Sequence, residues 1–342
     1  MGWLLSTTLK NLAKELGLSV STVSRIMNGK GKFPEKTKNR VLDMANKLGY
    51  TPNIYARSLR EQEYHVMGLI VPNVINPFFG TILQATEEEC RKIGYTLLSG
   101  VSGYSKERET EYINYLASNQ VNGVILVSHD SEDEIREMHY RGMQVISLNE
   151  HGKNEEIDWV SIDSHAAMMD LTQYLINQGH KDIACVYGLD EFYISETESN
   201  RLSGYMDCMK KNGLPVDDNK VIGTYENFEA AKREAQKLLC LSQLPSAVVC
   251  HNNEIAAGVY EAAIEAGYSV PKDISIACFD SILPDNIVGV QFTSILQPLE
   301  DISSIAVNMI ANGDLTEDIN RERKRINLPY SLRMGTTTAP RN

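Results

Sequence analysis

The sequence predicts an α/β protein in which an all-α module precedes two doubly wound domains with parallel sheets. Its 342 residues suit two or three domains. Helical patterns alone fill the first sixty residues, whereas from Val66 onward buried-strand runs alternate with helical patterns in two similar rounds. Ligands of parallel sheets bind at the carboxyl ends of the strands. We therefore expect a ligand site in the cleft between the two halves.

The first helix is predicted within "TLKNLAKELG". Thr8 is placed as its N-cap, and Gly17 ends it. Its apolar residues recur with the spacing of one helix face: Leu9, Leu12, Ala13 and Leu16.

A second helix is predicted within "LGLSVSTVSRIMNG", with Ser19 as an N-cap candidate. Its apolar stripe comprises Val20, Val23 and Ile26/Met27, and it lies opposite Ser21, Thr22 and Arg25. Two short helices joined by a tight turn form the helix-turn-helix pattern, whose second helix offers its first side chains to the major groove of DNA. An ordinary helical hairpin has the same local pattern and is the alternative on this stretch alone.

A third amphipathic helix is predicted within "PEKTKNRVLDMANKLGY", and Gly49 ends it. Its apolar face comprises Val41, Leu42, Ala45 and Leu48. In "TPNIYARSLREQ", Pro52 then breaks the chain and Asn53 is the N-cap candidate of a helix of about two turns. A helix this short is rarely stable alone, so this segment is predicted to be a hinge that orders on binding.

The two α/β rounds are predicted from buried-strand runs and the helical patterns between them. The first has strands at 66–72, 95–100, 121–128 and 144–149 and helices at 77–94 and 106–119. The second has strands at 181–188, 246–252 and 273–281 and helices at 198–213, 229–242 and 254–267. A repeated strand-helix order predicts two similar subdomains.

The charge distribution separates the two ends of the chain. The net charge is −12, but residues 1–60 hold eleven Lys or Arg against three Asp or Glu, a balance of +8. The rest holds 22 basic and 42 acidic residues, a balance of −20. A basic module on an acidic body is expected when only one end of a protein meets phosphates.

The cysteines favour a reduced protein without a metal site. They lie far apart, in apolar contexts and without CxxC spacing: Cys90, Cys185, Cys208, Cys240, Cys250 and Cys278. We expect mostly buried thiols in a cytoplasmic protein. No stretch of 18 apolar residues predicts a membrane span, and the run in "MGWLLS" is too short for a signal peptide.

An enzymatic function is poorly supported, and no catalytic residue or cofactor is predicted. The sequence lacks GxGxxG after a strand, GxxxxGK[ST], HExxH and GxSxG. His180 and His251 each lie beside a strand with no obvious nucleophile nearby, so we expect structural roles for both. A periplasmic-type solute-binding protein is a second alternative, but the basic first sixty residues argue against it.

Five motifs in order resemble the lactose-repressor/galactose-repressor (LacI/GalR) family of bacterial transcription regulators. They are the run from "TLKNLAKELG" to "IYARSLR", then "GLIVPNVINPFF", "RLSGY", "VPKDISIACFD" and "TSILQP", and they extend from about Thr8 to about Arg333. The resemblance implies a helix-turn-helix headpiece at 1–52 and a hinge helix with linker at 53–63. It also implies a periplasmic-binding-protein-like core, with an N-subdomain at 64–163 and 294–326 and a C-subdomain at 164–293 and 327–342.

The resemblance assigns DNA binding to residues of the headpiece and the hinge. They are Ser19, Val20, Ser21, Thr22, Arg25, Asn28, Tyr50, Asn53, Ala56 and Leu59. Arg25 suits guanine, because its fork can pair O6 and N7. Val20 is apolar where many members have a polar residue, which leaves a contact such as a thymine methyl. Leu59 matches a wedge that enters the minor groove, with a core leucine as the alternative, and Ala56 matches a small residue between paired hinge helices.

The resemblance also places an effector in the cleft of the core. Its candidate residues are Phe78, Phe79, Asn149, Thr197, Arg201, Phe228, Asn252 and Asp280. The phenylalanines would stack on a ring, with core packing as the alternative for at least one of them. Arg201 would donate a fork of hydrogen bonds to the effector, and Asp280 would accept two hydrogen bonds from neighbouring hydroxyls or an amine of the effector. "HNN" replaces the common "AND", so Asn253 stands for an acid, and "FDS" replaces "FDD".

Together these features predict a homodimeric repressor that binds a pseudo-palindromic operator in double-stranded DNA. A small polar effector, most simply a sugar or sugar derivative, would control it. Control by a phosphocarrier protein on the surface is the alternative. The sequence leaves open whether the effector releases or strengthens DNA binding. The tail "SLRMGTTTAPRN" has no leucine heptads, which predicts no tetramerising coiled coil.

Overall fold

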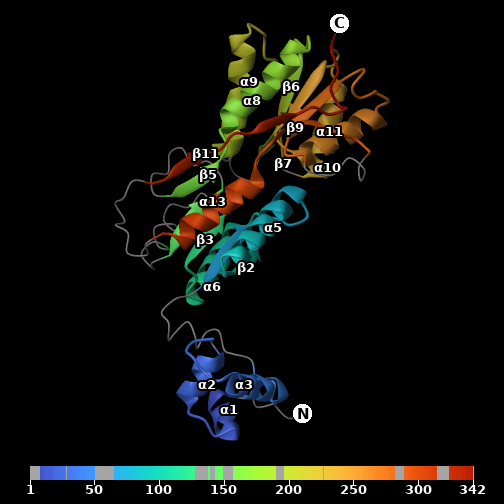
Figure 1. Ribbon diagram of the computed structural model, residues 1–342. Coiled ribbons are helices and arrows are strands. Elements are labelled where there is room, and N and C mark those ends of the chain that lie inside the picture. The colour runs from blue at the N-terminus through green and yellow to red at the C-terminus, as the bar shows by residue number, and fades with distance from the viewer. Residues whose placement is uncertain are drawn as a thin grey trace. The chain divides into compact units, whose positions relative to one another are not determined.

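The computed structural model describes residues 8–27, 29–50, 65–127, 138, 143–148, 157–189, 196–225, 227–281, 289–313 and 323–341. The chain divides into two compact units, Met1–Tyr64 and His65–Asn342. Each is described by itself (Figure 1). The predicted hinge helix at 53–63 lies outside the described residues.

The first unit is built from three short helices, α1 (Leu9–Leu16), α2 (Val20–Met27) and α3 (Glu35–Lys47). The hydroxyl of Thr8 accepts a hydrogen bond from the backbone N–H of Asn11 at 3.3 Å, and Gly17 ends α1 at φ 64°. Both positions match the predicted caps. The core consists of Leu12, Ala13, Leu16, Val23, Ile26, Val41 and Ala45.

Two apolar positions of this unit differ from the prediction. Val20 is 41% exposed and Leu42 is 44% exposed. Three short helices enclose only a narrow core, and Val23 and Val41 occupy the inward positions of α2 and α3. The exposed Val20 therefore joins the polar side of α2 rather than its apolar stripe.

The first sheet of the second unit has the strand order β11-β5-β4-β3-β1-β2, and all its pairs are parallel. The strands are β1 (Val66–Val71), β2 (Thr96–Val101), β3 (Gly123–Leu126), β4 (Gln144–Ser147), β5 (Asp158–Ser161) and β11 (Arg325–Asn327). Helices α5 (Pro77–Lys92) and α13 (Leu299–Ala311) run side by side and bury Ile82 and Ile302 in the core on one face (Figure 1). Helix α6 (Lys106–Ser118) buries Ile113 and Leu116 in the core on the other.

The second sheet has the order β12-β10-β9-β8-β6-β7. Its strands are β6 (Ile183–Leu189), β7 (Val221–Tyr225), β8 (Ala247–Cys250), β9 (Ser275–Phe279), β10 (Thr293–Leu296) and β12 (Ser331–Arg333). Helices α8 (Ser164–Asn177) and α9 (Glu196–Lys211) pack beside one another, and α10 (Phe228–Leu239) pairs with α11 (Asn253–Glu265). The predicted parallel sheet is present, with one edge strand, β12, running antiparallel to β10.

The chain passes between the two sheets three times. It leaves the first sheet after β5, returns between β10 and α13, and crosses again between β11 and β12. The predicted boundary at residues 293/294 cuts β10, whose pairing with β9 assigns the whole strand to the second sheet. That crossing therefore follows Leu296. The second unit therefore contains two subdomains, each with its own sheet, and three chain segments connect the two sheets.

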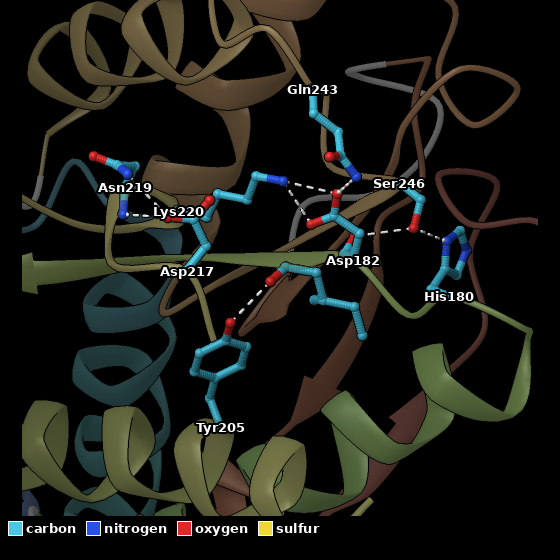
Figure 2. A network of polar contacts seen from close by, with 9 residues as sticks. His180, Asp182, Tyr205, Asp217, Asn219, Lys220, Gln243 and Ser246 are labelled. Carbon is cyan, nitrogen blue, oxygen red and sulfur yellow. Dashed lines mark hydrogen bonds and ion pairs between the residues drawn. The ribbon is translucent and has the colours of Figure 1, made fainter. Parts of the chain in front are cut away.

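A polar network ties together loops at the amino ends of β6 and β8 (Figure 2). The buried Lys220 ammonium contacts the Asp182 carboxylate at 2.7 and 2.8 Å, and Gln243 donates to the same carboxylate at 3.1 Å. His180 contacts the Ser246 hydroxyl through Nδ1 at 3.0 Å and the Ala339 carbonyl through Nε2 at 3.1 Å. These contacts support the predicted structural role of His180.

The cysteines match the prediction at five of six positions, because Cys240 is exposed. It caps the carboxyl end of α10, where a helix terminus meets solvent. Burial raises the pKa of the Cys90 thiol to about 11 and that of Cys278 to about 12. These buried thiols therefore stay protonated and unreactive near neutral pH.

Candidate functional site

The first candidate site is the solvent-facing side of α2. Ser19, Val20, Ser21 and Arg25 are exposed there, and Thr22 is half-buried. The Ser19 hydroxyl accepts from the backbone N–H of Thr22 at 3.1 Å, as an N-cap does, and it also contacts the hydroxyls of Ser21 and Thr22 at 2.9 and 2.8 Å. The start of α2 thus presents a pre-ordered cluster of hydroxyls beside an apolar Val20.

Arg25 is supported by a residue that the sequence analysis missed. Its guanidinium carbon lies 5.9 Å from the centroid of the half-buried Phe33 ring, within the range of a cation–π contact. Between the two in sequence lies Gly31, where a Cβ would stand 3.1 Å from both Arg25 Nη2 and Phe33 Cε2. The available signal was an aromatic residue directly after a Gly/Lys-rich loop. Phe33 and Gly31 together limit where the Arg25 side chain can lie.

Several predicted site residues lie outside the described residues. They are Asn28, Asn53, Ala56, Leu59 and Asn149. Thr197 lies on α9, but its side chain is also outside the description. Tyr50 is half-buried against the core of the first unit, just beyond the end of α3.

The second candidate site centres on Arg201 of α9 and Asp280, which directly follows β9. Both are buried, at 5% and 4% exposure, and Arg201 Nη2 lies 3.7 Å from Asp280 Oδ2. Arg201 also donates through Nη1 to the backbone carbonyl of His251 at 2.6 Å, and its guanidinium carbon lies 4.2 Å from the centroid of the Phe279 ring. A buried charge of this kind is tolerated only with such partners. The structure thus brings together two of the residues predicted to bind the effector, and their role in binding it stays a prediction.

Two further residues contact this pair in ways that were not predicted, Gln297 through its side chain and His251 through its backbone carbonyl. Gln297, in the crossing segment after β10, donates to Asp280 Oδ2 at 2.9 Å. His251 follows β8, is fully buried, and has its Nε2 3.8 Å from the Cys185 sulfur. His251 therefore has a structural role and also supplies the carbonyl that orients Arg201. The motif "TSILQP" contained Gln297, but nothing in its spacing indicated a contact with Asp280.

The phenylalanines and asparagines occupy the starts of two helices. Phe78 and Phe79 are both half-buried in the first turn of α5, with ring centroids 5.2 Å apart in an edge-to-face contact. The N-cap Asn76 accepts from the backbone N–H of Phe78 at 3.0 Å. Each phenylalanine packs partly on the core and keeps some exposed surface.

The start of α5 meets the start of α11 across the two subdomains. Asn252 is the N-cap of α11 and accepts from the backbone N–H of Ile255 at 2.8 Å, so one of its amide atoms has a structural task. Its neighbour Asn253 exchanges two amide hydrogen bonds with Asn76, each 3.4 Å long. The residue that replaces an acid in the common pattern is therefore a contact between the subdomains.

Phe228 is the first residue of α10 and is half-buried. Its backbone carbonyl packs against Gly258 of α11, where a Cβ would stand only 2.6 Å away.

Among the helices within the described ranges, none is long and apolar enough to cross a membrane.

Comparison with known proteins extends over both units. Residues 64–312 match the family described as periplasmic binding proteins and sugar binding domain of the LacI family, and residues 8–53 match the bacterial regulatory proteins of the lacI family. The transcriptional regulator DegA of Bacillus subtilis (strain 168) is 29% identical over 342 residues, covering 99% of this chain and 100% of that protein.

Two solved structures are similar in fold. The lac repressor dimer bound to operator and the anti-inducer ONPF aligns with a TM-score of 0.83 at 19% identity, covering 98% of this chain and 99% of that one. A LacI family transcriptional regulator from Enterococcus faecium with bound ribose aligns with a TM-score of 0.70 at 25% identity, covering 81% of this chain and 100% of that one. From these matches and the order of its two units, the chain belongs to the lacI family of bacterial regulatory proteins.

Proposed function

We propose that the protein is a homodimeric repressor that binds a pseudo-palindromic operator and is controlled by a small polar effector, a sugar or sugar derivative. The observation that carries the effector site is the buried Arg201–Asp280 pair at the carboxyl end of the second sheet. Arginine offers a fork of donors and aspartate offers two acceptor oxygens, which suits a ligand rich in hydroxyls. The ribose in the Enterococcus relative supports this ligand class.

The DNA-binding half of the proposal rests on the basic first sixty residues and on the exposed side of α2. In this proposal Arg25 contacts a base in the major groove, and Leu59 enters the minor groove together with its dimer mate. The protein regulates transcription and is not an enzyme. We place it in the cytoplasm, because its DNA target is there.

The proposed mechanism is a linkage between the two sites. The effector favours one arrangement of the core subdomains about the three crossing segments, and that arrangement changes the spacing of the paired hinge helices. A coupling of about 1 to 3 kcal/mol would change operator affinity about 5- to 150-fold. Induction and corepression use the same parts, so the sign of the response comes from measurement.

A thermal-melt screen of the full chain tests the effector site. Sugars, sugar phosphates, polyols, nucleosides and amino acids would be compared on the wild type and on Asp280→Ala. A ligand at 100 times its Kd adds about 2.7 kcal/mol of stability, which corresponds to a shift of several degrees. We expect one chemical class to shift the wild type and to leave Asp280→Ala unchanged.

The same screen separates the alternatives. A hit that shifts both proteins equally would move the effector site away from Asp280. No hit from any class would favour the phosphocarrier alternative, which a pull-down with purified phosphocarrier proteins then tests.

A separate measurement tests the minor-groove wedge assigned to Leu59. If Leu59→Ala binds both operator and random DNA as tightly as the wild type does, that role is refuted.

A further inference from the structure

The turn that follows β9 is held in an unusual conformation. Asp280 has φ 59°, in the left-handed region that few residues other than glycine adopt. Such a conformation is strained for a residue other than glycine and persists only where the surroundings impose it. The turn carries the proposed effector carboxylate, so the contacts that impose its conformation also place that carboxylate.

Backbone and side-chain contacts to β10 fix the turn from one side. The backbone N–H of Asp280 donates to the carbonyl of Ile295 at 2.8 Å. The backbone N–H of Ser281 donates to the buried hydroxyl of Ser294 at 3.1 Å. Both donors of the turn are thus satisfied by consecutive residues of one strand.

Arg333 fixes the turn from the carbonyl side. Its Nη2 donates to the backbone carbonyl of Ser281. Arg333 is the last residue of β12 and pairs with Ser294 of β10, which in turn pairs with Cys278 of β9. Residues that pair across strands share a face, so Arg333 lies on the face where Cys278 packs with α10 and α11. Arg201, over the Phe279 ring, lies on the opposite face.

One crossing segment and the strand that begins after another crossing segment therefore contact the same turn. Gln297, between β10 and α13, donates to the Asp280 carboxylate. Arg333 is the last residue of the three-residue strand β12, which begins directly after the crossing segment 328–330 that joins β11 of the first sheet to β12 of the second. A rearrangement of the subdomains must change the backbone of these segments, because they connect the two sheets.

We propose that Arg333 is a positioning residue that couples the Asp280–Ser281 turn to the third crossing segment, so that occupancy of the effector site is relayed to the subdomain angle. This inference rests on the proposed effector role of Asp280. An arginine suits the task, because its planar fork gives a directed, charge-assisted bond to a carbonyl at the end of a long stem.

Amide hydrogen exchange on the full chain tests this coupling without any ligand. In Arg333→Met we expect exchange to rise about tenfold or more at Asp280 and Ser281, and also at Leu328 of segment 328–330, whose backbone N–H donates to the Ser161 carbonyl at 2.8 Å. Arg333→Lys, which keeps the charge and one donor, should restore part of the protection. The converse is expected for Asp280→Ala: a change in the turn should accelerate amide exchange at residues 328–333.

Arg325→Met is the matched control, because Arg325 is an exposed arginine of β11 on the other side of the same crossing. It should leave the turn unchanged. Amide exchange at the central strands β6 and β8 reports global unfolding. If Arg333→Met accelerates exchange in these strands, the test of the coupling uses Arg333→Lys instead. The coupling would be overturned if Arg333→Met accelerated exchange only in the turn. It would also be overturned if Asp280→Ala left exchange at residues 328–333 unchanged.

The outcome is separable from that of the ligand screen. Coupled exchange together with a failed screen would leave Arg333 as a link between turn and crossing segment and would refute only the effector role of Asp280. A successful screen with uncoupled exchange would refute the role of Arg333 alone.

Discussion

The two candidate sites are built in opposite ways. The groups that shape the candidate DNA-binding side of α2 lie between Ser19 and Phe33, and most of them are exposed. The candidate effector site gathers Arg201, Asp280 and Gln297 from three separate elements and buries its charges. An exposed arginine is solvated whatever its neighbours do, whereas a buried arginine depends on its partners. Equivalent substitutions should therefore have different consequences at the two sites.

The largest effect is expected for Arg201→Met. Removing one member of a buried ion pair leaves the Asp280 carboxylate without its cation, and such losses cost about 3 to 5 kcal/mol. Urea denaturation of the full chain measures the change. Arg25→Met is the matched control and should cost no more than about 1 kcal/mol, because Arg25 is exposed and loses only its cation–π contact with Phe33. Similar costs for the two variants would contradict the contrast between the sites.

Arg25→Ala should affect recognition instead of folding. A bidentate contact to a base is worth about 1 to 3 kcal/mol of discrimination. We expect preference at one base pair of each half-site to relax while nonspecific affinity changes little. Selection from a randomised operator library measures the preference, and an unchanged profile would exclude Arg25 from base contact.

The pH dependence of folding should report on His180. Burial lowers the pKa of His180, so the unfolded chain takes up a proton more readily than the folded one. Its contribution to stability is complete above the unfolded pKa of about 6.5 and decreases as the pH falls toward the folded pKa. One proton limits this slope to about 1.4 kcal/mol per pH unit.

His180→Gln should flatten the decrease, because glutamine can still donate a hydrogen bond to the Ala339 carbonyl but does not titrate. Urea titrations at pH 7 and pH 5 measure it. His165→Gln, at a histidine on the surface of α8, is the control. A wild-type stability that rises on acidification would show that other groups dominate.

The smallest effect is expected for Phe33→Leu. Loss of the ring removes a cation–π contact worth about 0.5 to 1 kcal/mol at an exposed site, which should weaken the base preference assigned to Arg25 without abolishing it. Phe33→Trp should retain or strengthen that preference. If Phe33→Leu weakens the base preference as much in the Arg25→Ala variant as in the wild type, Phe33 acts only through the fold of the first unit and not through Arg25.

The contrast also explains what could be predicted. The caps Thr8, Ser19 and Gly17 and the third helix follow from local signals, and the structure has them. Local patterns failed for Val20 and Leu42, because burial in a small bundle depends on the angle at which helices meet. They also missed Phe33, whose contact with Arg25 needs the loop at Gly31 to fold back.

In the core, the resemblance to the family singled out Arg201 and Asp280 but not what supports them. Short strands such as β5 and β12 carry four and three residues, too few for a clear alternation. Without β12 in place, nothing connected Arg333 with Ser281, and without the crossing after Leu296 nothing connected Gln297 with Asp280.

The sequence alone thus determined the headpiece pattern, the basic first sixty residues and the alternation of strands and helices. Each depends on residues within a few turns of one another or on composition. Only the tertiary structure decided which buried charges meet, which strand runs antiparallel, and which residues hold the turn at Asp280. Those outcomes depend on contacts between residues far apart in the chain, and such contacts are fixed only when the sheets assemble.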